Sequence, residues 1–126
     1  MKYYSEEHQW AQPDQDGVTV AIGISAFAAE ELGEVNFVEL PAPGTTIAAG
    51  DTLCVVESVK AASDVIAPVG GRVVAVNERL STQPGLLNEA PEGDGWICRL
   101  SQVPPTDLER LMDEKGYRLF LHGDNV

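Results

Sequence analysis

The chain has 126 residues, of which 44% are apolar and 22% charged; we expect one domain spanning residues 1–126, with no room for a second core. Its formal charge of −12 argues against nucleic acid as a partner, because neutralising phosphates requires clustered lysine and arginine. No apolar run reaches the roughly 20 residues that a membrane span needs, and the N-terminal "MKYYSEEHQW" lacks the apolar centre of a signal peptide. We therefore expect a cytoplasmic protein with no membrane partner.

In chain order, the sequence reads as short strands separated by glycine and proline. The predicted strands are 17–24, 34–40, 51–58, 62–68, 70–77 and 95–101. Between the first two, "SAFAAEELG" predicts a short helix over 25–33, with Ser25 as its N-cap and Gly33 just past its end. Residues 81–95 predict a loop. This pattern indicates an all-β sandwich or barrel with peripheral helices.

The C-terminal part of the chain predicts one more helix, near 106–116. Thr106 and Glu109 have the spacing of a capping box, and Gly116 would end the helix. The apolar stripe consists of Leu108, Leu111 and Met112. We expect this stripe to pack on the core rather than to bind a partner.

The sequence offers no recognisable metal site or catalytic group. Cys54 and Cys98 each lie inside an apolar, strand-like run, which predicts buried thiols. There is no CxxC pair, and neither His8 nor His122 has neighbours at ligand spacing. No Ser/His/Asp ordering, phosphate-binding loop or close acidic pair is evident, so we expect a protein that is not an enzyme.

The segment "VESVKAASD" (56–64) places Lys60 at the tip of a predicted hairpin. The chain has only two other lysines, Lys2 and Lys115, and both lie near its ends. Small residues surround Lys60, strands brace the turn, and Glu57 and Asp64 stand on either side. A rigidly displayed amine suits enzymatic acylation, since the enzyme must recognise one fixed shape and reject the other lysines. A merely solvated lysine is the alternative reading, and the residues alone do not identify a cargo.

"ESVKAASD" resembles the lipoyl-attachment motif of the H-protein family of the glycine cleavage system. Further blocks similar to that family surround it in the family's order: "EHQW" (7–10), "VAIGIS" (20–25), "ELGEVNFVELP" (31–41), "APVGGRVVAVN" (67–77) and "GLLNEAPEGDGW" (85–96). The resemblance implies a barrel-sandwich hybrid fold (hammerhead), of the biotinyl/lipoyl-carrier type. It also implies lipoic acid in amide linkage to Lys60.

The resemblance further implies a non-catalytic carrier in glycine catabolism. A lipoyl arm would take an aminomethyl group from glycine decarboxylase (P protein) to the aminomethyltransferase (T protein). Dihydrolipoyl dehydrogenase (L protein) would reoxidise the arm, and a lipoate ligase or a lipoyl/octanoyl transferase would attach it. Glu57, Asp64 and His8 are then the residues expected at the cleft that receives the loaded arm. Trp10 is expected to pack, and Trp96 to lie in the core.

Other carriers remain as alternatives. The family's N-terminal motif usually has glutamate where this chain has Gln9, so an H-like lipoate-binding protein that serves lipoyl relay or sulfur oxidation stays open. A biotin carrier usually has methionine on both sides of its lysine, where this chain has Val59 and Ala61. A lipoyl domain of a 2-oxoacid dehydrogenase would carry an Ala/Pro-rich linker, which does not appear. A purely structural binding module predicts no special role for Lys60.

Overall fold

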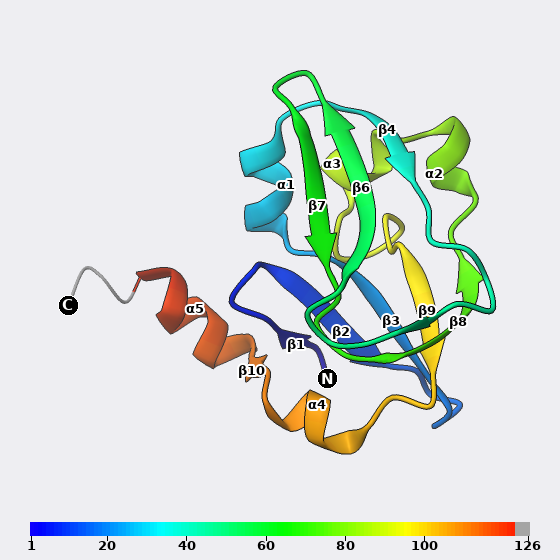
Figure 1. Ribbon diagram of the computed structural model, residues 1–126. Helices are drawn as coiled ribbons and strands as arrows, with labels where there is room; N and C mark the ends of the chain where they lie inside the picture. The colour runs from blue at the N-terminus through cyan, green and yellow to red at the C-terminus, as the bar shows by residue number, and fades with distance from the viewer. Residues whose placement is uncertain (123–126) are drawn as a thin grey trace.

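The structure, a computed structural model that describes residues 1–122, consists of two antiparallel sheets with short helices around them (Figure 1). The larger sheet has seven strands in the order β10-β1-β2-β3-β9-β8-β5, and the smaller has three in the order β4-β6-β7. The strands are β1 (Tyr3–Tyr4), β2 (Gln9–Pro13), β3 (Thr19–Ile24), β4 (Val35–Glu39), β5 (Thr46–Ile47), β6 (Thr52–Ser58), β7 (Ala62–Ile66), β8 (Gly71–Val76), β9 (Cys98–Ser101) and β10 (Met112–Asp113). The helices are α1 (Ala26–Leu32), α2 (Arg79–Thr82), α3 (Leu86–Glu89), α4 (Pro105–Glu109) and α5 (Glu114–His122). The predicted class, all-β with peripheral helices, is confirmed.

The main hydrophobic core draws on both sheets. Ile22, Val56 and Leu100 come from three different strands and are each 0% exposed. Removing such a side chain from water stabilises a fold by about 1.5–3 kcal/mol. Cys54 and Cys98 are buried in the same core, as predicted, and this burial raises the pKa of each thiol to about 12.

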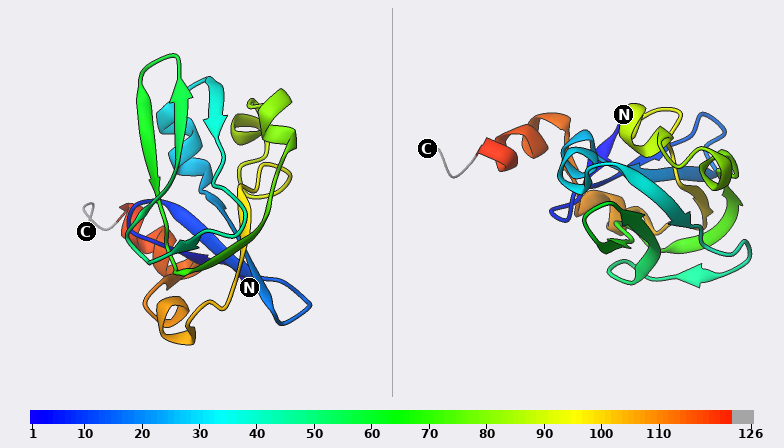
Figure 2. Two further views of the ribbon diagram at one scale, coloured as in Figure 1. Left: turned by 45° about the vertical axis from the view of Figure 1, so that its right-hand side comes forward. Right: turned by 90° about the horizontal axis from the view of Figure 1, so that it is seen from above.

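The hairpin of β6 and β7 carries the segment that the sequence singles out. Its register pairs Glu57 with Ala62, and residues 59–61 form the turn between the end of β6 and the start of β7. Figure 1 shows the hairpin as the uppermost feature of the molecule, and the left view of Figure 2 shows it extending beyond the rest of the chain. Because β6 also pairs with β4, its backbone is hydrogen-bonded on both sides. The Lys60 turn therefore stands on a well-supported strand.

The helix predicted between the first two strands is present as α1. Ser25 caps it by accepting a hydrogen bond from the Ala28 N–H, and Gly33 follows its last residue with a φ of 73°. A positive φ is a conformation that glycine adopts readily, which explains why the helix ends at this residue. The next strand, predicted over 34–40, is observed as β4.

A single helix near 106–116 is wrong, because the chain forms two helices, α4 and α5, with β10 between them. Pro105 rather than Thr106 starts α4, and no side chain caps that helix. Of the predicted apolar stripe, only Leu108 lies in α4. Leu111 follows the helix, and Met112 pairs with Tyr4 of β1 as part of β10. A second helix, α5, begins at Glu114 and contains Gly116, whose N–H donates to the Asp113 carboxylate at 2.7 Å.

Other elements were absent from the sequence-based expectation. Four strands (β1, β2, β5 and β10) were not predicted, and the predicted loop over 81–95 contains α3. Most of these strands are two residues long and exist through pairing with distant segments, so no local pattern marks them. None of the helices within residues 1–122 is long and apolar enough to span a bilayer.

Candidate functional site

The hairpin tip holds its own backbone together. The Ser58 N–H donates to the Ala61 carbonyl at 3.0 Å, and the Ser58 hydroxyl accepts from the Lys60 N–H at 3.2 Å. A third bond, from the Val59 N–H to the Glu34 carbonyl at 3.0 Å, ties the tip to the segment before β4. Lys60 itself is exposed, as its predicted place at the tip of a hairpin requires. The turn is thus fixed by hydrogen bonds, while its side chains stay accessible.

The Lys60 side chain rests on the C-terminal end of α1. Its ammonium donates to the Glu31 carbonyl at 3.3 Å, and a Cβ at Gly33 would lie 3.3 Å from Lys60 Cε. The C-terminal end of a helix favours a cation, because its last carbonyls are unpaired and carry partial negative charge. The amine therefore points along the molecule toward Glu31 rather than straight into solvent.

A cavity of about 350 Å³, which we call the α1–β7 pocket, is lined in part by Glu31, the residue whose carbonyl accepts from the Lys60 ammonium. Its lining residues are Glu7, His8, Gln9, Ile24, Phe27, Ala28, Glu31, Leu32, Ser63, Asp64 and Val65. The volume falls within the roughly 300–1,000 Å³ of small-molecule sites. The lining combines apolar side chains with three carboxylates, which suits a long apolar group that ends in a cation.

Four segments build the α1–β7 pocket: the turn that leads into β2, the end of β3, helix α1 and the edge strand β7. The helix contributes Phe27, Ala28, Glu31 and Leu32, which lie three or four residues apart on one helix face. Their spacing was visible in the sequence, and it is the signal that could have identified Phe27 and Glu31 as site residues. The sequence reasoning missed Glu31.

Gln9 closes the turn that forms one wall of the pocket. Its amide oxygen accepts from the Ser5 hydroxyl at 2.7 Å, and its amide nitrogen donates to the Glu7 carbonyl at 2.8 Å. A glutamate here would have no N–H for the Glu7 carbonyl, so the amide belongs to the structure of this turn. The pocket nevertheless keeps negative charge, because Glu7, Glu31 and Asp64 also line it.

His8 lies in the same turn, with an unusual backbone φ of 74°. A non-glycine residue in this region costs of order 1–3 kcal/mol, so the surrounding contacts must hold it there. Its ring packs against Phe27 at a centroid distance of 4.6 Å. Burial lowers the pKa of His8, while Glu7 and Glu31 act in the opposite direction. The imidazole is therefore uncharged at neutral pH.

The structure brings some of the predicted site residues together and separates one. His8 and Asp64 both line the α1–β7 pocket, whereas Glu57 does not line it. Glu57 is exposed on β6, in register with Phe37 of β4 and Ala62 of β7, and so lies on the outer face of the small sheet.

The expectation is confirmed for Trp10, which packs in the interior, and is wrong for Trp96, which lies at the edge of a second hydrophobic cluster rather than in a core. Trp10 is 2% exposed and donates its ring N–H to the Pro91 carbonyl at 3.0 Å. Trp96 is half-buried, and the Arg99 guanidinium lies over its ring at 4.1 Å. Neither residue lines the α1–β7 pocket.

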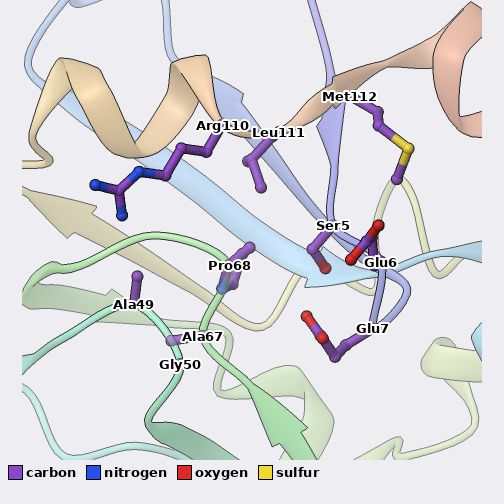
Figure 3. A pocket seen from close by; sticks show the side chains of 10 residues that line it. All are labelled: Ser5, Glu6, Glu7, Ala49, Gly50, Ala67, Pro68, Arg110, Leu111 and Met112. Atoms are coloured by element: carbon purple, nitrogen blue, oxygen red, sulfur yellow. The ribbon is translucent and has the colours of Figure 1, made fainter.

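A second, larger cavity of about 430 Å³ (Figure 3) lies away from Lys60, so it does not suit a group attached to that lysine. Its lining includes Gly50 and Pro68, which flank the ends of β6 and β7 opposite to the Lys60 turn. In Figure 3 the Arg110 side chain extends away from Glu6 and Glu7. Within residues 1–122, no cluster of His, Cys, Asp and Glu could hold a metal ion. We therefore place the candidate site at Lys60 and the α1–β7 pocket.

Known proteins resemble this chain over nearly its whole length. The family model described as "Glycine cleavage H-protein" matches residues 2–124. A glycine cleavage system H protein of Pseudoalteromonas atlantica is 50% identical over 90% of this chain and 88% of its own length. Glycine cleavage system H protein 2 of Pseudomonas putida is 51% identical over 94% of this chain and 91% of its own. The crystal structure of a glycine cleavage system H protein from Mycobacterium marinum covers 98% of this chain and 95% of its own, with a TM-score of 0.81 and 34% identity.

Proposed function

The chain belongs to the glycine cleavage H-protein family, and from this premise we propose that it carries the aminomethyl group of glycine on a lipoyl group attached to Lys60. The family match over residues 2–124 is the observation that carries the proposal. Shared fold with the M. marinum protein supports the barrel-sandwich hybrid architecture that displays such a lysine. The carrier role assigns no catalytic group to the chain itself.

Among the three lysines, Lys60 offers the geometry that an acylating enzyme needs. It stands on a turn whose backbone is already hydrogen-bonded, and its neighbours Val59 and Ala61 are exposed. Lys2 differs, because its ammonium donates to the Glu92 carbonyl at 2.6 Å and lies 4.6 Å from the Trp10 ring centroid. Lys115 lies on the helix α5 rather than on a turn. A lipoate ligase or a lipoyl/octanoyl transferase would thus find one suitable amine.

The α1–β7 pocket fits a lipoyl arm that starts at Lys60. When attached, the lipoyl group supplies a dithiolane whose sulfur accepts and releases the aminomethyl group. Phe27 and Leu32 provide apolar surface for the arm, and they keep water from the cargo. Glu7, Glu31 and Asp64 attract the cargo's ammonium, although each partly exposed ion pair contributes only about 0–1 kcal/mol.

The partners follow from the carrier role. Glycine decarboxylase (P protein) would load the arm, the aminomethyltransferase (T protein) would unload it, and dihydrolipoyl dehydrogenase (L protein) would reoxidise it. Glu57 lies outside the pocket, so it is not assigned to the arm. The net charge of −12 suits partner surfaces that are basic around their active-site openings.

Attachment at Lys60 is tested by intact-mass analysis and peptide mapping of protein taken from its native host. We expect the mass of one lipoyl amide on the whole protein and its location on the peptide that contains Lys60. An unmodified Lys60 in lipoate-replete cells would contradict the proposal.

The pathway is tested separately by an exchange assay between glycine and labelled bicarbonate with the host's glycine decarboxylase. We expect exchange that requires the lipoylated chain and is absent with the unlipoylated one. Full lipoylation without any exchange would instead support an H-like carrier for lipoyl relay or sulfur oxidation.

A further inference from the structure

The Tyr117 hydroxyl links α5 to two other segments. It lies 2.8 Å from the Ser25 hydroxyl oxygen, at the cap of α1, and 2.7 Å from His8 Nδ1, in the wall of the α1–β7 pocket. The Tyr117 ring is 6% exposed and stacks on the Tyr4 ring at 4.4 Å with an interplanar angle of 4°. The phenol is therefore held in place by packing, independently of its hydrogen bonds.

The direction of these two hydrogen bonds can be deduced. Ser25 is 0% exposed, and its oxygen already accepts from the Ala28 N–H. Within residues 1–122, the Tyr117 oxygen is the only acceptor for the hydroxyl hydrogen of Ser25. A buried hydroxyl that lacks an acceptor is costly, so Ser25 donates to Tyr117. Tyr117 then uses its own hydrogen to donate to His8 Nδ1, which must be unprotonated.

This chain of bonds determines the tautomer of His8. With Nδ1 acting as the acceptor, the ring hydrogen of the neutral imidazole resides on Nε2. Within the described residues, Nε2 has no protein partner, so it is the ring nitrogen that remains for a group bound in the pocket. We propose that Tyr117 is a positioning residue, which holds His8 as the Nε2–H tautomer so that the pocket presents a hydrogen-bond donor and no base to the cargo.

The tautomer matters because of the cargo's chemistry, an inference that rests on the proposed function. An aminomethyl group on sulfur is stable while its nitrogen is an ammonium. If a base takes one proton, the nitrogen lone pair forms a C=N bond as the C–S bond breaks and the sulfur leaves as thiolate. Water then converts the released iminium ion into formaldehyde and ammonium. An imidazole with an unprotonated Nε2 beside the cargo would be such a base.

The charges around His8 are consistent with this role. Glu7 from its own turn, Glu31 from α1 and Asp64 from β7 line the same pocket, and they favour an ammonium there. On the α5 side the neighbour is the phenol of Tyr117, whose pKa is raised by burial and which stays protonated. A neutral His8 adds no positive charge that would oppose the cargo.

The first test is the His8 tautomer itself, measured by ¹⁵N NMR of the imidazole in the unlipoylated full-length chain. In the wild type we expect an acceptor-type shift for Nδ1 and a donor-type shift for Nε2. Tyr117→Phe keeps the ring and removes only the hydroxyl, so we expect a mixture of tautomers. Tyr3→Phe removes a hydroxyl with no hydrogen bond among the described residues and serves as the matched control. Unchanged His8 shifts in folded Tyr117→Phe would overturn the proposal.

The second test is the lifetime of the loaded, lipoylated carrier after its decarboxylase has been removed, followed by formaldehyde release at pH 7.5. We expect Tyr117→Phe to release formaldehyde about threefold faster, well below the 10²-fold or more of an aligned catalytic base. The same substitution in a His8→Asn background should have no effect, because asparagine tolerates the positive φ and provides no base. Equal acceleration in both backgrounds would contradict the positioning role. Failure of the wild type to load at all would count against the proposed function instead.

Discussion

The hairpin tip and the wall of the α1–β7 pocket are built in opposite ways. At the tip, Val59, Lys60 and Ala61 are exposed, and local hydrogen bonds through Ser58 hold the turn. In the wall, the buried side chains of Gln9 and Ser25 are hydrogen-bonded into a network that joins the N-terminal turn, α1 and α5. A carrier needs one end that enzymes can grasp and another that keeps its shape. Substitutions at the tip should therefore change chemistry, and those in the wall should change stability.

The largest effect is expected at the tip. Lys60→Arg should abolish lipoylation completely, because guanidinium is not an acceptor for the acyl group. Its free energy of unfolding should stay within about 0.5 kcal/mol of the wild type, since the side chain is exposed. Intact mass and urea unfolding measure the two quantities. Lys115→Arg is the control, and a lipoyl mass that persists in Lys60→Arg would place the attachment elsewhere.

The next effect is expected beside the wall, where β2 packs closely on β3. Gly23 pairs with Trp10 across β2 and β3, and a Cβ at Gly23 would lie 2.6 Å from two atoms of the Trp10 ring. Gly23→Ala should lower the free energy of unfolding by about 1–3 kcal/mol through overpacking. Gly85→Ala is the matched control, because nothing lies within 4 Å of its Cβ position. Equal urea midpoints for the two variants would show that the Trp10 ring moves aside at no cost.

A smaller effect is expected where the two regions meet. The Asn88 side chain donates to the Gly33 carbonyl at 2.6 Å and accepts from the Val35 N–H at 2.9 Å, so it braces the link between α1 and β4. Asn88→Ala should cost about 1 kcal/mol, the usual net value of such bonds. Urea unfolding beside Glu89→Ala, an exposed neighbour, provides the comparison. If both variants unfold alike, the brace contributes nothing to stability.

The smallest effect is a dependence of the free energy of unfolding on pH, caused by His8 in the wall of the pocket. Burial lowers the pKa of His8 from its ordinary 6.5, so the unfolded chain binds more protons than the folded one below that pH. The stability that comes from neutral His8 is therefore complete above pH 6.5 and is lost as the pH falls toward the lowered pKa. Urea unfolding between pH 7.5 and 5 should thus show a steeper loss for the wild type than for His8→Asn. Parallel curves would mean that folding leaves the pKa of His8 unchanged.

The elements that the sequence predicted well are those with local signals. Small residues between two β-branched runs predicted the Lys60 turn, and Ser25 and Gly33 marked the ends of α1. One continuous helix near 106–116 is wrong: α4 starts within one residue of the predicted start but ends at Glu109, because Met112 and Asp113 pair with β1 as β10. That pairing joins residues more than a hundred positions apart, and no local periodicity reveals it.

The site was predictable to a similar extent. Lys60 and Asp64 came from "ESVKAASD" and His8 from "EHQW", but whether His8 and Asp64 share one pocket depends on how β7 lies against α1. Tyr117 could not be predicted, because the expected helix ended at Gly116 and left the next residue without a role. Its contact with His8 spans 109 positions in the chain. Only the fold brings the phenol to the imidazole.

The burial of Cys54 and Cys98 has a consequence for sulfur chemistry. Thiolate, rather than thiol, attacks a disulfide, and a pKa of about 12 leaves almost no thiolate on either core cysteine at neutral pH. A dithiolane tethered to the same molecule would therefore meet no internal nucleophile during its oxidised phase. Electrons would enter and leave such a carrier solely through its arm, and the barrel beneath would stay inert to exchange.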